Sequence, residues 1–237
     1  INIKDIIILT ISCIIIGQCK MAYLPLIFIS LLIPMDKYKN KKWYFIDNAI
    51  IIASAFLGTW IWDKVAASTH YGTGIGEQQI WILAHPINYI IVMFRTAVEY
   101  FNHIFFGIAA GNSLYQARVH VPEAISFGLM VCLGISLFIK ESTNEIKLWK
   151  KILIICIMGG IALLVVTAMY VSATTIVTGK IGTKIIEGIQ GRYFIPAIAL
   201  CAMIFKKKTI NIDEKYLYAT TIMLQFAVIL NTVLTFI

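Results

Sequence analysis

The chain has 237 residues, of which 59% are hydrophobic and only 14% are charged. Soluble domains carry about a quarter charged residues, so this composition excludes an ordinary soluble protein and indicates one that crosses a membrane several times. The net charge of +8 does not call for nucleic acid, which we do not expect as a partner, because an excess of lysine in a membrane protein usually sets its orientation.

Seven apolar segments predict helices that cross or enter the bilayer. They lie at roughly 6–18, 22–35, 44–62, 124–139, 152–171, 185–205 and 216–236. A spanning helix needs about 20 residues, and the first two segments are shorter, so they form either a hairpin of short helices or one interrupted helix. We therefore predict a single all-α integral membrane domain over residues 1–237, with about seven transmembrane helices, some short or broken. Because the chain begins with Ile1 rather than Met, we interpret it as the C-terminal part of a longer protein.

Lysines predict the orientation of these helices. They gather in three connecting segments, 37–42, 140–151 and 206–215. Loops rich in lysine usually face the cytoplasm, which places the segment 63–123 and the loop 172–192 on the extracytoplasmic side.

Within 63–123, residues 86–107 have an apolar and a polar face at helical spacing. As an eighth span, this helix would turn the lysine-rich loop at 140–151 outward, so we expect it to lie in the outer membrane interface instead. All four histidines fall in 63–123, but none is spaced for metal binding. We expect no metal site and no cofactor. Several carboxylates in this segment suit a general base, and the sequence singles out none of them.

The stretch EGIQGRYFIP, residues 187–196, holds the first candidate site. Gly188 and Gly191 allow a tight turn or a close backbone approach. Arg192 then lies at the outer mouth of the sixth apolar segment, and its planar fork of donors suits a phosphate or carboxylate. The alternative is an arginine that anchors a helix end by reaching to the membrane surface.

The stretch CKMAYLP, residues 19–25, holds the second candidate. Lys20 lies at the break between the first two apolar segments, on the predicted outer side. It is either an anion contact or a turn lysine that reaches water. If Lys20 and Arg192 converge, they form one cationic pocket at the depth of lipid headgroups.

These stretches resemble a known family. GIQGRYFIP is similar to the hallmark of an uncharacterised bacterial family of polytopic membrane proteins (domain of unknown function 2142). CKMAYLPLIFISLLIP resembles its AKPPY-type turn, although both prolines of the turn are missing here. EQQIWILAHPINYIIVMFRT resembles its outer segment, and the three matches span about 18 to 205.

The layout of that family is similar to glycosyltransferases that take sugars from polyprenyl-phosphate donors. The resemblance implies a glycosyltransferase-like protein of the bacterial cytoplasmic membrane that acts on the outer face in cell-envelope glycan assembly. The catalytic acid of such enzymes usually precedes the region present here, so no catalytic residue is nominated. The alternative is a non-enzymatic scaffold or transport subunit in envelope polysaccharide export, docking through 63–123. In the first interpretation Lys20 and Arg192 hold the lipid phosphate, and Tyr23, Gln190, Gly191, Tyr193 and His85 line the pocket.

Overall fold

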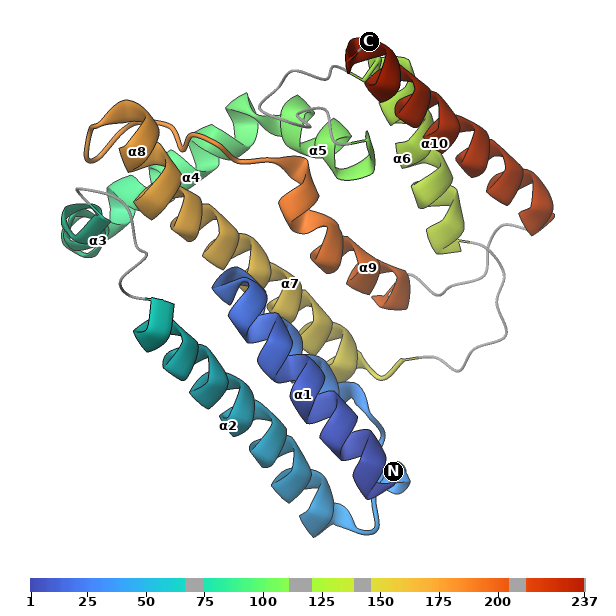
Figure 1. Cartoon of the computed structure of the whole chain (residues 1–237). Coiled ribbons are helices and arrows are strands. Elements are labelled where there is room, and N and C mark those ends of the chain that lie inside the picture. Colours follow the sequence, from blue (N-terminus) through green and yellow to red (C-terminus); the bar gives the residue numbers. More distant parts are fainter. Residues whose placement is uncertain (67–74, 111–120, 139–145, 205–211, 237) are drawn as a thin grey trace.

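A computed structural model of the chain describes residues 1–66, 75–110, 121–138, 146–204 and 212–236 (Figure 1). All regular structure in these ranges is helical. Three of the helices there are long and apolar enough to cross a membrane: α2 (Lys41–Ala66), the continuous helix Leu148–Thr178, and α10 (Glu214–Phe236). The prediction of an all-α membrane protein is confirmed.

Each predicted apolar segment contains a helix, although several helices are too short to span alone. The shorter ones are α1 (Ile3–Cys19), η1 (Met21–Leu32), α6 (Glu123–Phe138) and α9 (Ile195–Ile204). α7 (Leu148–Met169) begins the long central helix. Its buried stripe of Ile154, Ile157, Ile161 and Val165 packs against η1 and α9 in one hydrophobic core.

The first two segments form a hairpin of two helices, which decides between the two predicted arrangements. α1 ends at Cys19, Lys20 is extended, and η1 runs back, so the ammonium group of Ile1 donates a hydrogen bond to the Lys37 carbonyl. η1 is a 3₁₀ helix, which is unusual at this length. Its Pro25 has no N–H to donate and packs on Gly160 of α7 instead.

The long central helix does not end with α7. It continues through a π-helical turn, η4 (Tyr170–Thr174), and a last α-turn, α8 (Thr175–Thr178). Gly179 ends it with φ of +63°, and its N–H bonds to the Thr175 carbonyl. This left-handed residue is a common helix terminator because glycine adopts it without a steric penalty.

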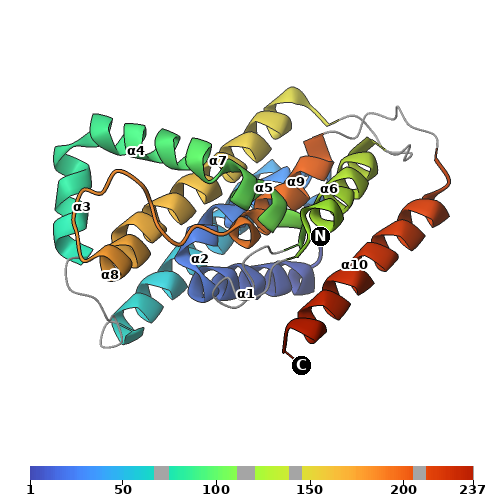
Figure 2. The same ribbon diagram turned by 90° about the horizontal axis from the view of Figure 1, so that it is seen from above.

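Three helices run across this end of the molecule (Figure 2): α3 (Ile75–Ala84), α4 (Pro86–Glu99) and α5 (Phe101–Ala110). α3 and α4 meet at an angle of 107°, and together they are apolar enough for one bent span. The helix predicted over 86–107 is interrupted at Tyr100. Whether α4 lies in the membrane interface stays a prediction. Its buried side chains are Tyr89, Val92 and Thr96, and its large exposed apolar side chains are Ile87, Ile90, Ile91, Phe94 and Val98.

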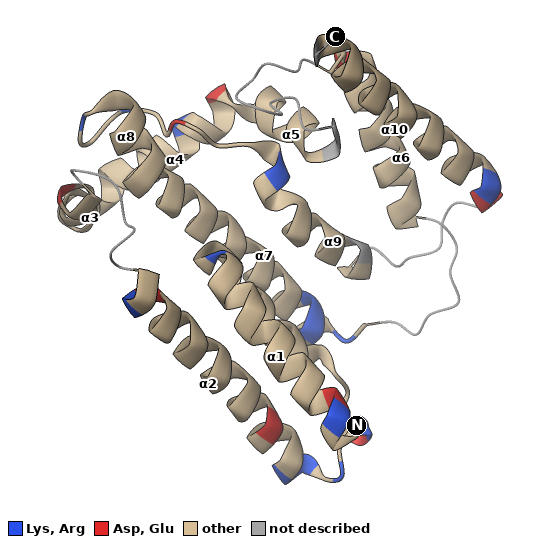
Figure 3. Ribbon diagram, viewed as in Figure 1, with Lys and Arg blue, Asp and Glu red and all other residues tan. Residues whose placement is uncertain are grey.

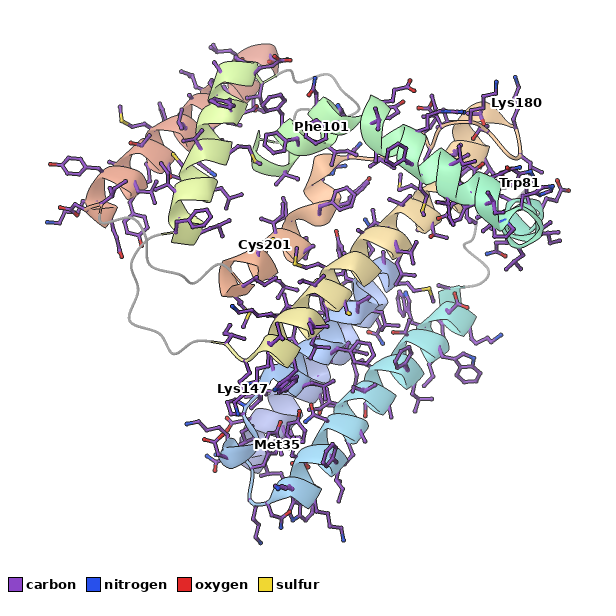
Figure 4. The ribbon with its side chains drawn as sticks, turned by 180° about the vertical axis from the view of Figure 1, so that it is seen from behind. Met35, Trp81, Phe101, Lys147, Lys180 and Cys201 are labelled. Carbon is purple, nitrogen blue, oxygen red and sulfur yellow. The ribbon has the colours of Figure 1, made fainter. Side chains whose placement is uncertain are left out.

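Charged residues gather near the helix ends (Figure 3). The lysine-rich loop before α2 and the lysines that begin α7 share one end, where Lys150 Nζ donates to the Leu32 carbonyl at 2.6 Å. Met35 and Lys147 lie at that end, and Trp81 and Lys180 lie at the opposite one (Figure 4). Residues 206–208 of the third lysine-rich segment lie outside the described residues. The shared end agrees with the predicted pattern, and its cytoplasmic assignment stays a prediction.

Candidate functional site

The two candidate cations meet at one aromatic ring. Lys20 Nζ lies 3.6 Å from the centroid of the Tyr193 ring, and Arg192 Cζ lies 5.6 Å from the same centroid. Lys20 Nζ is also 5.1 Å from the centroid of Tyr23. A cation over an aromatic face is attracted by the ring quadrupole. The structure therefore brings together Lys20, Tyr23, Arg192 and Tyr193, which lie in two distant parts of the sequence.

Local helix geometry explains how the start of η1 and the turn before α9 each present two of these residues. η1 is a 3₁₀ helix, in which residues three apart lie in one row, so Lys20 at its N-cap and Tyr23 face the same way. Arg192 and Tyr193 belong to η5 (Gly191–Phe194), the turn that starts α9. The Tyr23 hydroxyl donates to the Tyr193 carbonyl oxygen at 3.2 Å, which joins the two turns directly.

The electrostatics of this cluster favour an anion. Burial lowers the pKa of the Lys20 ammonium, and the positive charge of Arg192 lowers this pKa further. The positive charges of Lys20 and Arg192 therefore repel each other, and a bound phosphate or carboxylate relieves that repulsion. Among the described residues, no carboxylate contributes to the pKa shift of Lys20, whose causes are burial and Arg192. Arg192 is exposed and Lys20 is half-buried, so a ligand can reach both.

Gly191 sets how closely the turn approaches α5. A Cβ at this position would clash with the Ile104 carbonyl oxygen and with the backbone of Gly107. The predicted close backbone approach is therefore found at Gly191, and its partner on α5 is itself a glycine. Next to it, the side-chain oxygen of Gln190 is buried and has no hydrogen-bond partner among the described residues. A buried acceptor without a partner costs about 1–3 kcal/mol, so a donor from a ligand would be stabilised there.

His85 lies apart from the cation pair. It is exposed at the start of α4 and stacks on Trp81, with ring centroids 5.1 Å apart. Its Nδ1 lies 3.1 Å from the Trp81 carbonyl oxygen. Trp81 in turn contacts Tyr170 and Gly182. The described contacts of His85 thus connect it to α3 and the loop that follows α8, not to Lys20 or Arg192.

The helix predicted over 185–205 starts later than expected, because η5 begins at Gly191. Residues 185–190 belong to a loop whose backbone donors are taken by side chains. The Ile186 N–H bonds to Thr96 Oγ1 at 3.0 Å, and the Glu187 N–H bonds to Thr174 Oγ1 at 2.9 Å. Gly188 has φ of +79°. Ile186 is apolar because it is buried under α4, so its hydrophobicity resembled that of a spanning helix.

More polar contacts hold the whole segment between α8 and η5, and sequence reasoning missed them. Gln78 of α3 accepts the Gly182 N–H at 3.0 Å, and the Tyr170 hydroxyl donates to the Thr183 carbonyl at 2.8 Å. The Tyr100 hydroxyl donates to Glu187 Oε2 at 3.0 Å. Burial and this hydrogen bond to a carboxylate raise the pKa of Tyr100 to about 12. The available signal was the presence of polar residues such as Thr96 and Thr174 within apolar stretches.

In the part of the chain that the structure describes, no three histidine, cysteine, aspartate or glutamate side chains gather closely enough to hold a metal ion. The chemistry that the site offers is that of two cations, two aromatic rings and a buried amide oxygen.

Comparison with known protein families places the chain. A family model described as "Predicted membrane protein (DUF2142)" covers residues 1–201. The search found no matching curated protein and no matching solved structure. The matched region includes the hairpin, the cation pair and the loop before it, and it ends within α9. Since the match covers most of the chain, this protein belongs to the DUF2142 family of predicted membrane proteins.

Proposed function

We propose that this protein is a glycosyltransferase-like membrane protein of cell-envelope glycan assembly. It binds a polyprenyl-phosphate-linked sugar on the outer face of a bacterial cytoplasmic membrane. The phosphate lies between Lys20 and Arg192, beside Tyr23 and Tyr193. Gln190 lines the pocket, where its buried amide oxygen accepts a hydrogen bond from a hydroxyl of the sugar.

One observation carries the proposal: Lys20 and Arg192, from turns far apart in the sequence, lie over the same Tyr193 ring. Each positive charge disfavours the other, so an anion that binds between them is stabilised by both. Lys20 follows the last residue of α1 and Arg192 precedes α9, both short apolar helices. Cations at the ends of such helices meet the membrane where lipid phosphates lie.

The pair also suits the transfer reaction. When the bond between the sugar and the phosphate oxygen breaks, negative charge develops on the phosphate. Cations fixed in advance at that position stabilise the charge as it forms. Lys20 is held in advance by two aromatic rings. The residue that activates the acceptor hydroxyl stays unassigned.

The experiment is to replace Arg192 by alanine in cells and analyse surface glycan composition. We expect a reduced or truncated glycan at normal protein level. The matched control is Arg95→Ala, which removes an exposed arginine of α4. An unchanged glycan in the Arg192→Ala strain would refute the catalytic proposal.

A second candidate is a scaffold or transport subunit of polysaccharide export. The exposed apolar side chains of α4, among them Ile87, Phe94 and Val98, favour it, because such a surface suits either a membrane or a partner protein. Photocrosslinking from position 94 in intact cells separates the two roles. A stable protein adduct, with no lipid-phosphate binding by the purified chain, supports the scaffold.

A further inference from the structure

A groove begins at Met21, the residue that follows Lys20. Its volume is about 540 Å³, within the roughly 300–1,000 Å³ range of small-molecule sites. η1 forms its floor, and α2 and α7 form its walls. Figure 4 shows the molecule from the side on which α2, α7 and the N-terminal hairpin lie together. The groove is lined almost wholly by apolar side chains, including Met21, Leu24, Phe28, Phe56, Trp60 and Leu164.

The 3₁₀ geometry of η1 connects this groove to the cation site. Residues three apart share a row on such a helix. The row of Lys20 and Tyr23 faces Tyr193. The adjacent row, Met21 and Leu24, lines the groove. One turn of chain therefore presents a cation to the anion site and an apolar surface to the groove beside it.

The groove leads from the cation site into the depth of the membrane. Met21 and Phe28 are seven residues apart on η1, which corresponds to about 14 Å at the roughly 2.0 Å rise of a 3₁₀ helix. This is about half of the ~30 Å hydrocarbon core of a bilayer. At the Lys20 end the wall from α2 finishes with Asp63. Below it the lining is apolar except for Thr59, whose hydroxyl donates to the Ala55 carbonyl of its own helix.

The groove is also open to the side. Met21 and Trp60 are 57% and 59% exposed, and Leu164 on the α7 wall is 37% exposed. A hydrocarbon chain can enter such a groove from the bilayer without leaving an apolar environment. Its headgroup stays at the surface, where the cation pair lies.

We infer that this groove holds the single hydrocarbon chain of a polyprenyl phosphate whose phosphate lies between Lys20 and Arg192. The inference rests on the proposed function and adds how the lipid is recognised. The two cations bind the phosphate, and the groove binds a long single hydrocarbon chain. Without a contribution from the groove, the protein would bind short and long prenyl phosphates with equal affinity.

The test measures binding of three probes to the purified full chain in detergent: undecaprenyl monophosphate, dimethylallyl monophosphate and dioleoyl phosphatidate. Leu164→Trp fills the groove from its α7 wall. Leu163→Trp is the matched control, since Leu163 is the adjacent, exposed leucine and does not line the groove. We expect Leu164→Trp to weaken binding of the long probe about fivefold, a modest factor because a chain in a membrane exchanges one apolar contact for another. Binding of the short probe stays unchanged, and Leu163→Trp changes neither.

Other results overturn the inference in distinguishable ways. If Leu164→Trp binds the long probe as well as wild type does, the chain does not lie in this groove, although the phosphate site stands. If dioleoyl phosphatidate binds as tightly as the long prenyl phosphate, the occupant is a phospholipid. If wild type and a Lys20→Ala/Arg192→Ala variant bind the short probe equally, the phosphate site itself is wrong, and the groove assignment fails with it.

Discussion

Lys20 of the turn after α1 and Tyr193 of the turn before α9 are in direct cation–π contact, with Nζ 3.6 Å from the ring centroid. The contact joins two segments that both pack on α7, at the end opposite the lysine-rich loop before α2. It places the charge of Lys20 beside that of Arg192 before any ligand arrives. The predictions below concern this arrangement and the loop that supports it.

The Tyr193 ring should matter more than its hydroxyl. Cation–π contacts contribute about 0.5–2 kcal/mol, so losing the ring in Tyr193→Ala should weaken lipid-phosphate binding about 2- to 30-fold. Tyr193→Phe keeps the ring and should bind nearly as wild type. Titration of the purified variants with a prenyl phosphate measures both. Equal losses in the two variants would mean that the ring does not hold Lys20.

As pH rises, the affinity for a lipid phosphate should begin to fall at a lower pH than it would if Lys20 had the ordinary pKa of a lysine. Burial and Arg192 lower the pKa of free Lys20 below 10.5, so the ammonium charge is lost as pH rises through that lowered value. Lys20→Arg remains charged across this range and should keep its affinity. Comparing the two pH profiles is the measurement, and coincident profiles would contradict the prediction.

The same pKa shift has the opposite consequence for the stability of the ligand-free protein. The folded state disfavours the Lys20 ammonium, so its cost is present at pH values below the lowered pKa. The cost disappears as pH rises from that value toward 10.5. A bound phosphate should remove this cost at neutral pH.

Gly191→Ala should prevent the turn from packing on α5. The new methyl group meets the Ile104 carbonyl and the Gly107 backbone, which have no flexible end to move away. Overpacking of this kind costs about 1–3 kcal/mol or more. A clear fall in the thermal midpoint in detergent is expected. The control is Gly159→Ala, where no atom lies within 4 Å of the new methyl group, and it should leave the midpoint unchanged or slightly higher. Equal falls in both variants would contradict the close approach of Gly191 to α5.

Tyr100→Phe should loosen the loop before Gly191. The change removes the hydrogen bond to Glu187, worth about 1 kcal/mol, so amide exchange at 186–190 should become about fivefold faster if this segment opens locally. Tyr89→Phe is the control, since the hydroxyl of Tyr89 bonds to Thr167 elsewhere. It should not change exchange in this loop.

The pKa of Tyr100 gives that prediction a pH signature. Its pKa is raised from 10.0 to about 12, so its contribution to stability is full below pH 10.0 and is lost as pH rises through about 12. The difference in unfolding free energy between wild type and Tyr100→Phe should therefore shrink in alkali. A difference independent of pH would mean that burial and Glu187 together do not raise the pKa of Tyr100.

The apolar segments were predictable because burial in a bilayer demands long apolar runs whatever the packing inside. Packing itself was not: a break at Lys20 fits a hairpin or an interrupted helix, and the contacts of η1 with α7, such as Pro25 on Gly160, decide for the hairpin. The start of α9 was misplaced because Ile186 and Ile189 are apolar. They are buried against α4 as part of a loop, and burial of this kind does not require a helix.

The candidate site divides in the same way. Residue chemistry was enough to single out Lys20 and Arg192, since a cation beside an apolar segment is costly without a role. Their convergence depends on α7 holding η1 and α9 side by side, which no local pattern encodes. His85 was grouped with them through the resemblance of its stretch to the outer segment of the family, and its described ring contact is with Trp81. Tyr100 escaped notice because its partner Glu187 is far along the chain.

The most direct test of the cation pair is binding of undecaprenyl monophosphate to the purified chain, measured by native mass spectrometry. Lys20→Ala/Arg192→Ala is compared with Lys180→Ala/Arg95→Ala, which removes one exposed lysine and one exposed arginine elsewhere. Charge-assisted hydrogen bonds contribute about 1.5–3 kcal/mol each, so the first variant should bind at least about tenfold more weakly than wild type, while the second binds as wild type does. Equal binding by the two variants would contradict a phosphate site between Lys20 and Arg192.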